Sequence, residues 1–100
     1  MGKYNKLVRD KIPENLDSKG ISYEKRIASP EEYKEELFKK LNEEINEFLE
    51  AKNVEELADI QEVIDAIKKL PEFSDFDSIK AKKLEEKGGF EKKIILKGEK

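Results

Sequence analysis

The sequence predicts a mainly α-helical fold, in which an antiparallel helix hairpin forms the core of a bundle of about four helices and a small two-stranded β ribbon is added. Two stretches, about 29–51 and 53–70, carry apolar residues at the three- and four-residue spacing of an amphipathic helix. Pro71 and the pair Gly88-Gly89 follow helical stretches, where helices are expected to end. With 100 residues, the chain 1–100 fits a single domain with a small core.

The N-terminal third is predicted to hold a short helix and one strand of the ribbon. Asp10 is the expected N-cap of this helix, Pro13 lies in its first turn, and Gly20 ends it. Residues 21–28 alternate apolar and polar, which is typical of a strand. Residues 90–96 form the other expected strand, and pairing the two would complete the ribbon.

Three further helices are predicted from their start and stop signals. Ser29 is the expected N-cap of the first, with Glu32 completing a capping box. A break at 52–54 separates it from the next helix, which Pro71 ends. A last helix is expected over 74–87.

Composition narrows the possible chemistry. Charged residues make up 45% of the chain, and it has neither cysteine nor histidine. A disulfide, a thiolate site, a histidine base and the usual zinc ligands are therefore excluded. Carboxylate oxygens remain, and they favour a hard cation, Mg²⁺ or alternatively Mn²⁺.

Charge and hydropathy also indicate the surroundings of the protein. The net charge of −3 gives no general attraction to nucleic acid polymers or to anionic membranes. No apolar stretch approaches the roughly 20 residues needed to span a bilayer, and the N-terminus has no apolar signal region. We therefore expect a cytoplasmic protein without a membrane partner.

Two pairs of acidic residues are the strongest candidates for a metal site. Glu44 and Glu47 are three residues apart on one predicted helix, and Glu56 and Asp59 are three apart on the next. Each pair lies within or beside its apolar stripe, so the hairpin should bring all four carboxylates to one edge of the core. A divalent cation would offset their repulsion there.

Two other interpretations of these residues stay open at this point. Acidic pairs at this spacing are common on solvated helix faces, and Glu56 can also serve the helix cap at Asn53. Glu43 points away from the apolar stripe, which favours the interpretation that it is solvated. Alternatively, Glu43 is a ligand of a second metal ion or the base that deprotonates the attacking water.

Three blocks of the chain carry a resemblance to a known family. Glu43-Glu44-Ile45-Asn46-Glu47 followed by Glu56-Leu57-Ala58-Asp59 matches the EExxE…ExxD signature of the all-α NTP pyrophosphatases. Residues 4–13 at the start and 87–90 near the end extend this match over nearly the whole chain. The sequence thus resembles the single-domain MazG-like branch of a superfamily that includes dimeric dUTPases and phosphoribosyl-ATP pyrophosphohydrolase.

This resemblance implies hydrolysis of a nucleoside triphosphate to the monophosphate and pyrophosphate with Mg²⁺. The metal ligands that it implies are Glu44, Glu47, Glu56 and Asp59. One position departs from the pattern, because relatives often have arginine where this chain has Lys87, and lysine lacks the bidentate fork of arginine.

Basic residues are the candidates for binding the triphosphate. We expect Arg9, Lys83 and Lys87 to contact phosphates, and Lys6 and Lys11 are further candidates; the alternative is an ordinary solvated basic surface. A carboxylate, either Glu43 or Glu47, is the expected catalytic proton acceptor.

Two alternative functions remain beside a house-cleaning pyrophosphohydrolase. One is phosphoribosyl-ATP pyrophosphohydrolase of histidine biosynthesis, which has the same chemistry. The other is a non-catalytic helical module that dimerises or binds nucleotide. In every case a homodimer is expected, with a tetramer as the alternative, because a small core and amphipathic helices favour burial between copies.

Overall fold

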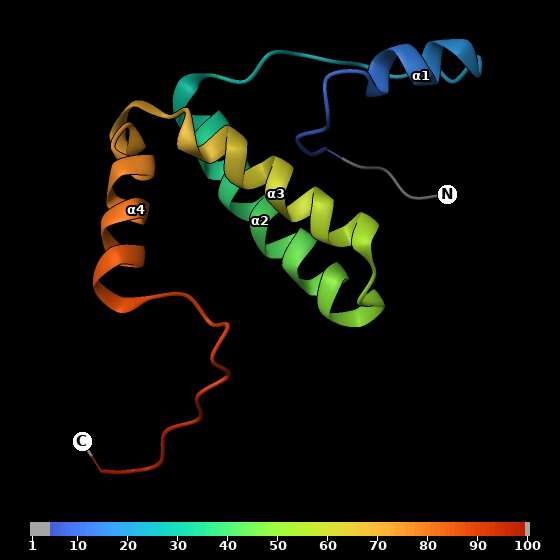
Figure 1. Ribbon diagram of the computed structural model, residues 1–100. Helices are drawn as coiled ribbons and strands as arrows, with labels where there is room; N and C mark the ends of the chain where they lie inside the picture. The colour runs from blue at the N-terminus through green and yellow to red at the C-terminus, as the bar shows by residue number, and fades with distance from the viewer. Residues whose placement is uncertain (1–4, 100) are drawn as a thin grey trace.

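The computed structural model describes residues 5–99, and this part of the chain is built from helices. In chain order they are α1 (Ile12–Ser18), α2 (Pro30–Ala51), α3 (Val54–Lys68), the 3-10 turn η1 (Pro71–Phe73) and α4 (Phe76–Lys87) (Figure 1). Tyr4, the first residue of the N-terminal block noted above, lies outside the described residues. The predicted mainly α-helical fold is confirmed.

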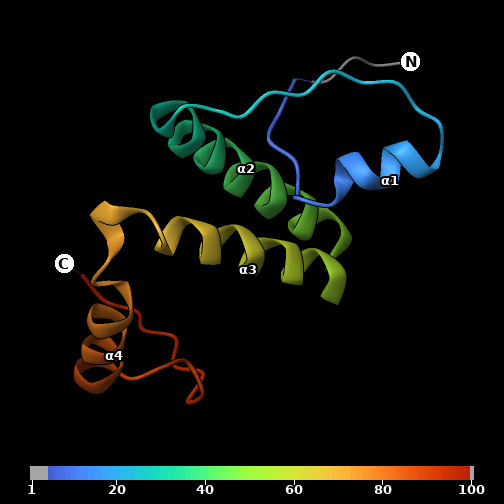
Figure 2. The ribbon, with the colours of Figure 1, turned by 90° about the horizontal axis from the view of Figure 1, so that it is seen from above.

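The helices α2 and α3 form the predicted antiparallel hairpin and lie side by side along their length (Figures 1 and 2). The chain reverses through Lys52, which takes the left-handed conformation at φ 52°. Side-chain caps begin both helices: the Ser29 Oγ accepts a hydrogen bond from the Glu32 amide (3.2 Å), and the Asn53 Oδ1 accepts one from the Glu56 amide (2.9 Å).

The second half of the predicted capping box at α2 does not form. The Glu32 carboxylate accepts hydrogen bonds from both terminal nitrogens of Arg26, at 2.5 and 2.6 Å, instead of turning back to the Ser29 amide. A bidentate, charge-assisted pair is a stronger interaction than a neutral amide–carboxylate bond. Arg26 therefore fastens the incoming connection to the first turn of α2.

A small core lies between the two hairpin helices. Leu37, Val63 and Leu70 are buried. The side chains packed against them come from the N-terminal segment, the hairpin and η1: Leu7, Tyr33, Leu41, Ala66, Ile67 and Phe73. Leu7 matters most for the site, because it anchors the N-terminal segment on the hairpin.

The helix α1 begins one residue later than predicted. Its N-cap is Lys11, without a side-chain capping bond, so Asp10 is not the cap. The end of the helix is as predicted at Gly20, which has a φ of 68°. The amides of Gly20 and Ile21 donate to the carbonyls of Asp17 and Leu16, as in a Schellman motif.

The predicted β ribbon was wrong, since residues 5–99 contain no strand. Residues 21–28 instead form an extended connection between α1 and α2, and residues 90–93 form a turn closed by a hydrogen bond from the Lys93 amide to the Phe90 carbonyl. The two segments lie on different sides of the molecule (Figure 1). An isolated two-stranded ribbon is marginal in water, and these two segments do not lie side by side (Figure 1).

The helix α4 points away from the hairpin (Figures 1 and 2). Its predicted start at Ser74 is replaced by η1 and a helix that begins at Phe76. The link to α3 is made by Lys68, whose Nζ lies 5.0 Å from the centroid of the Phe76 ring and 3.0 Å from Oδ1 of Asp77. No helix among the described residues has the length and apolar character to cross a membrane.

Candidate metal centre

The hairpin brings three of the four predicted ligands together. One carboxylate oxygen from each of Glu44, Glu56 and Asp59 lies within 4.8 Å of the others. Glu44 comes from the core-facing side of α2, and the other two come from the first turns of α3. The cap at Asn53 orients that first turn through its bond to the Glu56 amide. The local chemistry of the α3 start therefore positions Glu56, one of the three carboxylates.

Glu44 is the centre of this arrangement. It is only 6% exposed, and its Oε2 has no hydrogen-bond partner. Burial and, after it, the negative charge of Glu47 raise the pKa of Glu44, although Lys40 opposes this shift. Oε2 of Glu56 is likewise buried without a partner. Orphaned buried carboxylate oxygens are unfavourable, and a cation among them would remove the penalty.

The fourth predicted ligand, Glu47, belongs to a second group. Its carboxylate lies within 4.8 Å of oxygens from Glu43 and Glu44, and Glu47 is exposed. Glu44 is common to both groups, so the acidic cluster is continuous across the two helices. Within the described structure Glu47 is grouped with Glu43 and Glu44 and not with the α3 carboxylates.

Glu43 is less solvated than the sequence indicated. It is half-buried, and its Oε1 accepts bonds from the Nζ atoms of Lys6 (3.2 Å) and Lys40 (3.5 Å). Burial by itself raises the pKa of Glu43, but the bond from Lys6 and the charges of Lys40 and Lys6 outweigh it and hold that pKa below its usual value. Glu43 is therefore a carboxylate at neutral pH, as a proton acceptor must be.

The N-terminal segment supplies two of the predicted basic residues to the cluster. Nη1 of Arg9 lies 3.2 Å from Oδ1 of Asp59, and Nη2 lies 3.7 Å from Oε1 of Glu62. Lys6 reaches Glu43 on the other helix. The packing of Leu7 on the core holds this segment in place. Lys6 and Arg9 thus lie against the two acidic groups, one on each helix.

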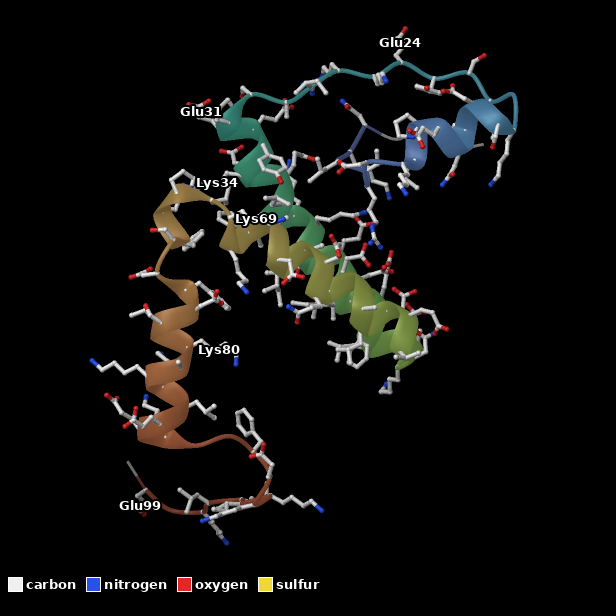
Figure 3. The ribbon with its side chains drawn as sticks, turned by 45° about the horizontal axis from the view of Figure 1, so that its top comes forward. Glu24, Glu31, Lys34, Lys69, Lys80 and Glu99 are labelled. Carbon is white, nitrogen blue, oxygen red and sulfur yellow. The ribbon has the colours of Figure 1, made fainter. Side chains whose placement is uncertain are left out.

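The other basic candidates lie elsewhere in the chain. Lys11 is the exposed N-cap of α1. Lys83 and Lys87 lie on α4, which Figure 3 shows, through the label on Lys80, to be well separated from the hairpin. Among residues 5–99, no ion pair joins either lysine to the carboxylates of the cluster. Within one chain, the structure does not bring Lys83 and Lys87 to this site.

Lys40 is a site residue that the sequence reasoning missed. Its Nζ lies 3.4 Å from Oε1 of Glu44 and 3.5 Å from Oε1 of Glu43, and its side chain is 17% exposed. The signal was available, because lysine three and four residues before two glutamates shares their helix face. Only burial distinguishes it from the many solvated lysines of this chain.

The donor set fits a hard divalent cation. Every candidate ligand is a carboxylate oxygen, from Glu43, Glu44, Glu47, Glu56 and Asp59. Glu44, Glu56 and Asp59 come from two helices that pack against each other around the core, and two of their oxygens lack a hydrogen-bond partner. The cluster could therefore hold a metal ion. Comparisons with protein families, with curated proteins and with solved structures gave no match for this chain.

Proposed function

We propose that this protein is a Mg²⁺-dependent pyrophosphohydrolase, which cleaves a nucleoside triphosphate to the nucleoside monophosphate and pyrophosphate. The observation that carries the proposal is the pair of buried, unpartnered oxygens, Oε2 of Glu44 and Oε2 of Glu56, in a carboxylate cluster flanked by basic side chains. The cluster supports a hard cation, and the flanking cations support an anionic substrate.

Cation binding would be shared by Glu44, Glu56 and Asp59, and Glu47 would be a further ligand through the group that it forms with Glu44. Mg²⁺ completes its six-fold coordination with water and substrate oxygens when protein carboxylates are few. When bound, it supplies Lewis-acid activation of the phosphoanhydride and of the attacking water. The softer sites that would select another metal need sulfur or imidazole, which this chain lacks.

The basic residues would change partners when substrate binds. Arg9 is paired with Asp59. If Asp59 held the cation, the guanidinium of Arg9 would be free to bind phosphate oxygens bidentately. Lys6 lies beside Glu43 and would add a second positive charge next to the cluster.

Glu43 is the better candidate for the proton acceptor. Its lowered pKa keeps it ionised, and it borders the cluster without belonging to the Glu44, Glu56 and Asp59 group. Glu47 is the alternative, although as a candidate ligand it would also have to serve the cation. The substitution Glu43→Gln should therefore lower the turnover number more than it lowers Mg²⁺ affinity.

The experiment that tests the function measures pyrophosphate release from a panel of nucleoside triphosphates, including dUTP and deaminated or oxidised forms, in Mg²⁺ and in EDTA. Glu56→Gln should abolish release while the helical circular dichroism spectrum is kept. Glu55→Gln is the matched control, because Glu55 is exposed and lies outside the cluster; it should retain activity.

Each outcome has a distinct meaning. Release that requires Mg²⁺ and is lost only in Glu56→Gln supports the proposal, and the best substrate indicates the role. Release from phosphoribosyl-ATP alone would move the assignment to histidine biosynthesis. Mg²⁺ or nucleotide binding without release from any substrate would favour a non-catalytic module, and full activity of Glu56→Gln would refute the site.

A further inference from the structure

Glu62 is an acidic residue beside the metal centre to which the proposed function gives no role. It lies on α3, three residues after Asp59, so the two side chains are neighbours on the helix surface. Glu62 belongs to neither carboxylate group of the described structure, and its side chain is 59% exposed. Among residues 5–99, its ion-pair partner is Arg9 alone. Glu62 is therefore connected to the site through Arg9 and not through the candidate cation ligands.

The two terminal nitrogens of Arg9 contact different carboxylates of α3. Nη1 lies 3.2 Å from Oδ1 of Asp59, and Nη2 lies 3.7 Å from Oε1 of Glu62. Asp59 contributes an oxygen to the group that it forms with Glu44 and Glu56. Because a guanidinium group is planar and rigid, these two contacts together fix its orientation. Nη1 lies next to the carboxylate cluster, and Nη2 lies next to a carboxylate outside it.

Glu62 is the contact that Arg9 would keep if Asp59 served a cation. Leu7 packs against the core and anchors the backbone of this segment two residues before Arg9. The Arg9 side chain itself is 60% exposed, and a long side chain loses rotamer freedom when it binds a ligand. A side chain that is already held in the binding orientation loses less, which raises affinity. The pair with Glu62 would provide this restraint without occupying Nη1.

We propose that Glu62 is a positioning residue, which holds Nη2 of Arg9 so that Nη1 is directed at the phosphate groups of the substrate. This inference rests on the proposed function, because it places those phosphates beside Asp59. Glu62 itself contacts neither the cation nor the substrate. An exposed ion pair contributes little to folding stability, so the effect of this pair is expected in substrate binding and turnover.

The test is a double-mutant cycle on the full chain with Glu62→Gln, Arg9→Gln and the double variant. Two quantities are measured at saturating Mg²⁺. One is kcat/KM for pyrophosphate release, and the other is the calorimetric affinity for a nucleoside triphosphate whose α,β-bridging oxygen is replaced by a methylene group. Glu62→Gln should lower both by about tenfold when Arg9 is present. In the Arg9→Gln background it should lower neither, because the residue through which Glu62 acts is absent.

Glu55→Gln is the control for the loss of one negative charge, because Glu55 is an exposed glutamate on the same helix. It should leave kcat/KM and the affinity for the analogue unchanged. The urea midpoint and the Mg²⁺ affinity of Glu62→Gln should match those of Glu55→Gln. Such a match separates the orientation of Arg9 from effects on folding or on cation binding.

The cycle distinguishes failure of this inference from failure of the proposed function. If wild type releases pyrophosphate but Glu62→Gln has the same effect with and without Arg9, or Glu55→Gln loses as much, the positioning role is overturned and the function stands. If wild type binds the analogue but releases no pyrophosphate, the function is refuted, and the affinities of the four proteins still decide the role of Glu62. No binding of the analogue by the wild type would overturn both.

Discussion

The Nζ atom of Lys40 lies 3.4 Å from Oε1 of Glu44, one turn further along α2, and both side chains are shielded from solvent. This contact neutralises one oxygen of the most buried carboxylate in the described structure and leaves the other, Oε2, without a partner. The ammonium group of Lys40 therefore supplies part of the positive charge that a divalent cation would supply. Removing Lys40 should lower the stability of the protein in EDTA and raise its affinity for metal.

We expect Lys40→Met to bind Mg²⁺ several-fold more tightly, because a competing positive charge is lost. In EDTA the same variant should be less stable by about 1–2 kcal/mol, since Glu44 loses its partner. Calorimetric Mg²⁺ titration and urea unfolding measure the two effects. Lys39→Met is the control, because Lys39 is exposed and, among residues 5–99, pairs only with Glu36. Equal metal-free stability of the Lys40 variant and the wild type would contradict the prediction.

The raised pKa of Glu44 predicts how stability varies with pH in EDTA. Burial and repulsion from Glu47 keep the proton on folded Glu44 above its ordinary pKa of 4.5. The folded state then binds more protons than the unfolded state, so the free energy of unfolding falls as pH rises from about 4.5 through the raised pKa. Saturating Mg²⁺ at neutral pH should restore the lost stability, because the cation replaces the proton.

The variant Glu44→Gln isolates this contribution from those of other acids. Its unfolding free energy in EDTA should lack that part of the pH dependence, and Mg²⁺ should no longer stabilise it. Urea unfolding at a series of pH values, with and without Mg²⁺, provides the comparison. Identical pH profiles for the variant and the wild type would show that Glu44 titrates normally.

Arg9 should matter for substrate much more than for folding. Its side chain is 60% exposed, so loss of its pairs with Asp59 and Glu62 should change stability by at most about 1 kcal/mol. We expect Arg9→Gln to lower kcat/KM by about 10²-fold, since one donor to transition-state charge is lost, while Mg²⁺ affinity is kept. Steady-state kinetics at saturating Mg²⁺ give the answer.

Arg26→Gln is the matched control for Arg9→Gln. Arg26 is equally exposed and also pairs with a glutamate, Glu32, but at the start of α2 and away from the carboxylate cluster. It should leave kcat/KM unchanged. If the two variants lose activity equally, the effect is a general consequence of lost charge and the role of Arg9 in substrate binding is refuted.

The two helix caps offer a test of how local structure positions the site. Asn53→Ala and Ser29→Ala each remove one capping bond, and each should cost about 1 kcal/mol of stability. Only Asn53 holds the first turn of α3, where Glu56 lies. We therefore expect Mg²⁺ affinity to fall in Asn53→Ala and to stay constant in Ser29→Ala, as measured by titration. A loss of affinity in both would mean that the cap acts through overall stability.

Local sequence signals were sufficient to predict where most of the helices begin and end. Ser29, Asn53 and Pro71 define where the hairpin helices begin and where the second one ends, because capping and proline geometry act within one turn. The three-residue spacing of Glu56 and Asp59 was also sufficient to place both carboxylates on one face of α3. These features depend on neighbours in the chain, so they can be derived without tertiary structure.

The prediction of a β ribbon was wrong because a ribbon depends on contacts between segments that are distant in the chain. Alternation in residues 21–28 and 90–96 describes a strand only where a partner strand and an apolar surface are available. The structure places these segments apart, so neither finds a partner. The start of α1 differs by one residue for a smaller reason, since Lys11, rather than Asp10, takes the N-cap position.

The sequence by itself determined a helical hairpin with caps at Ser29 and Asn53, and an acidic pair on each of its helices. Only the tertiary structure decided that Glu44 is the buried centre of the cluster and that Lys40 and Arg9 offset part of its negative charge. It also decided that Lys83 and Lys87 lie away from the cluster. The physical reason is that spacing along a helix sets the face of a residue, whereas burial and pairing depend on which other segment covers that face.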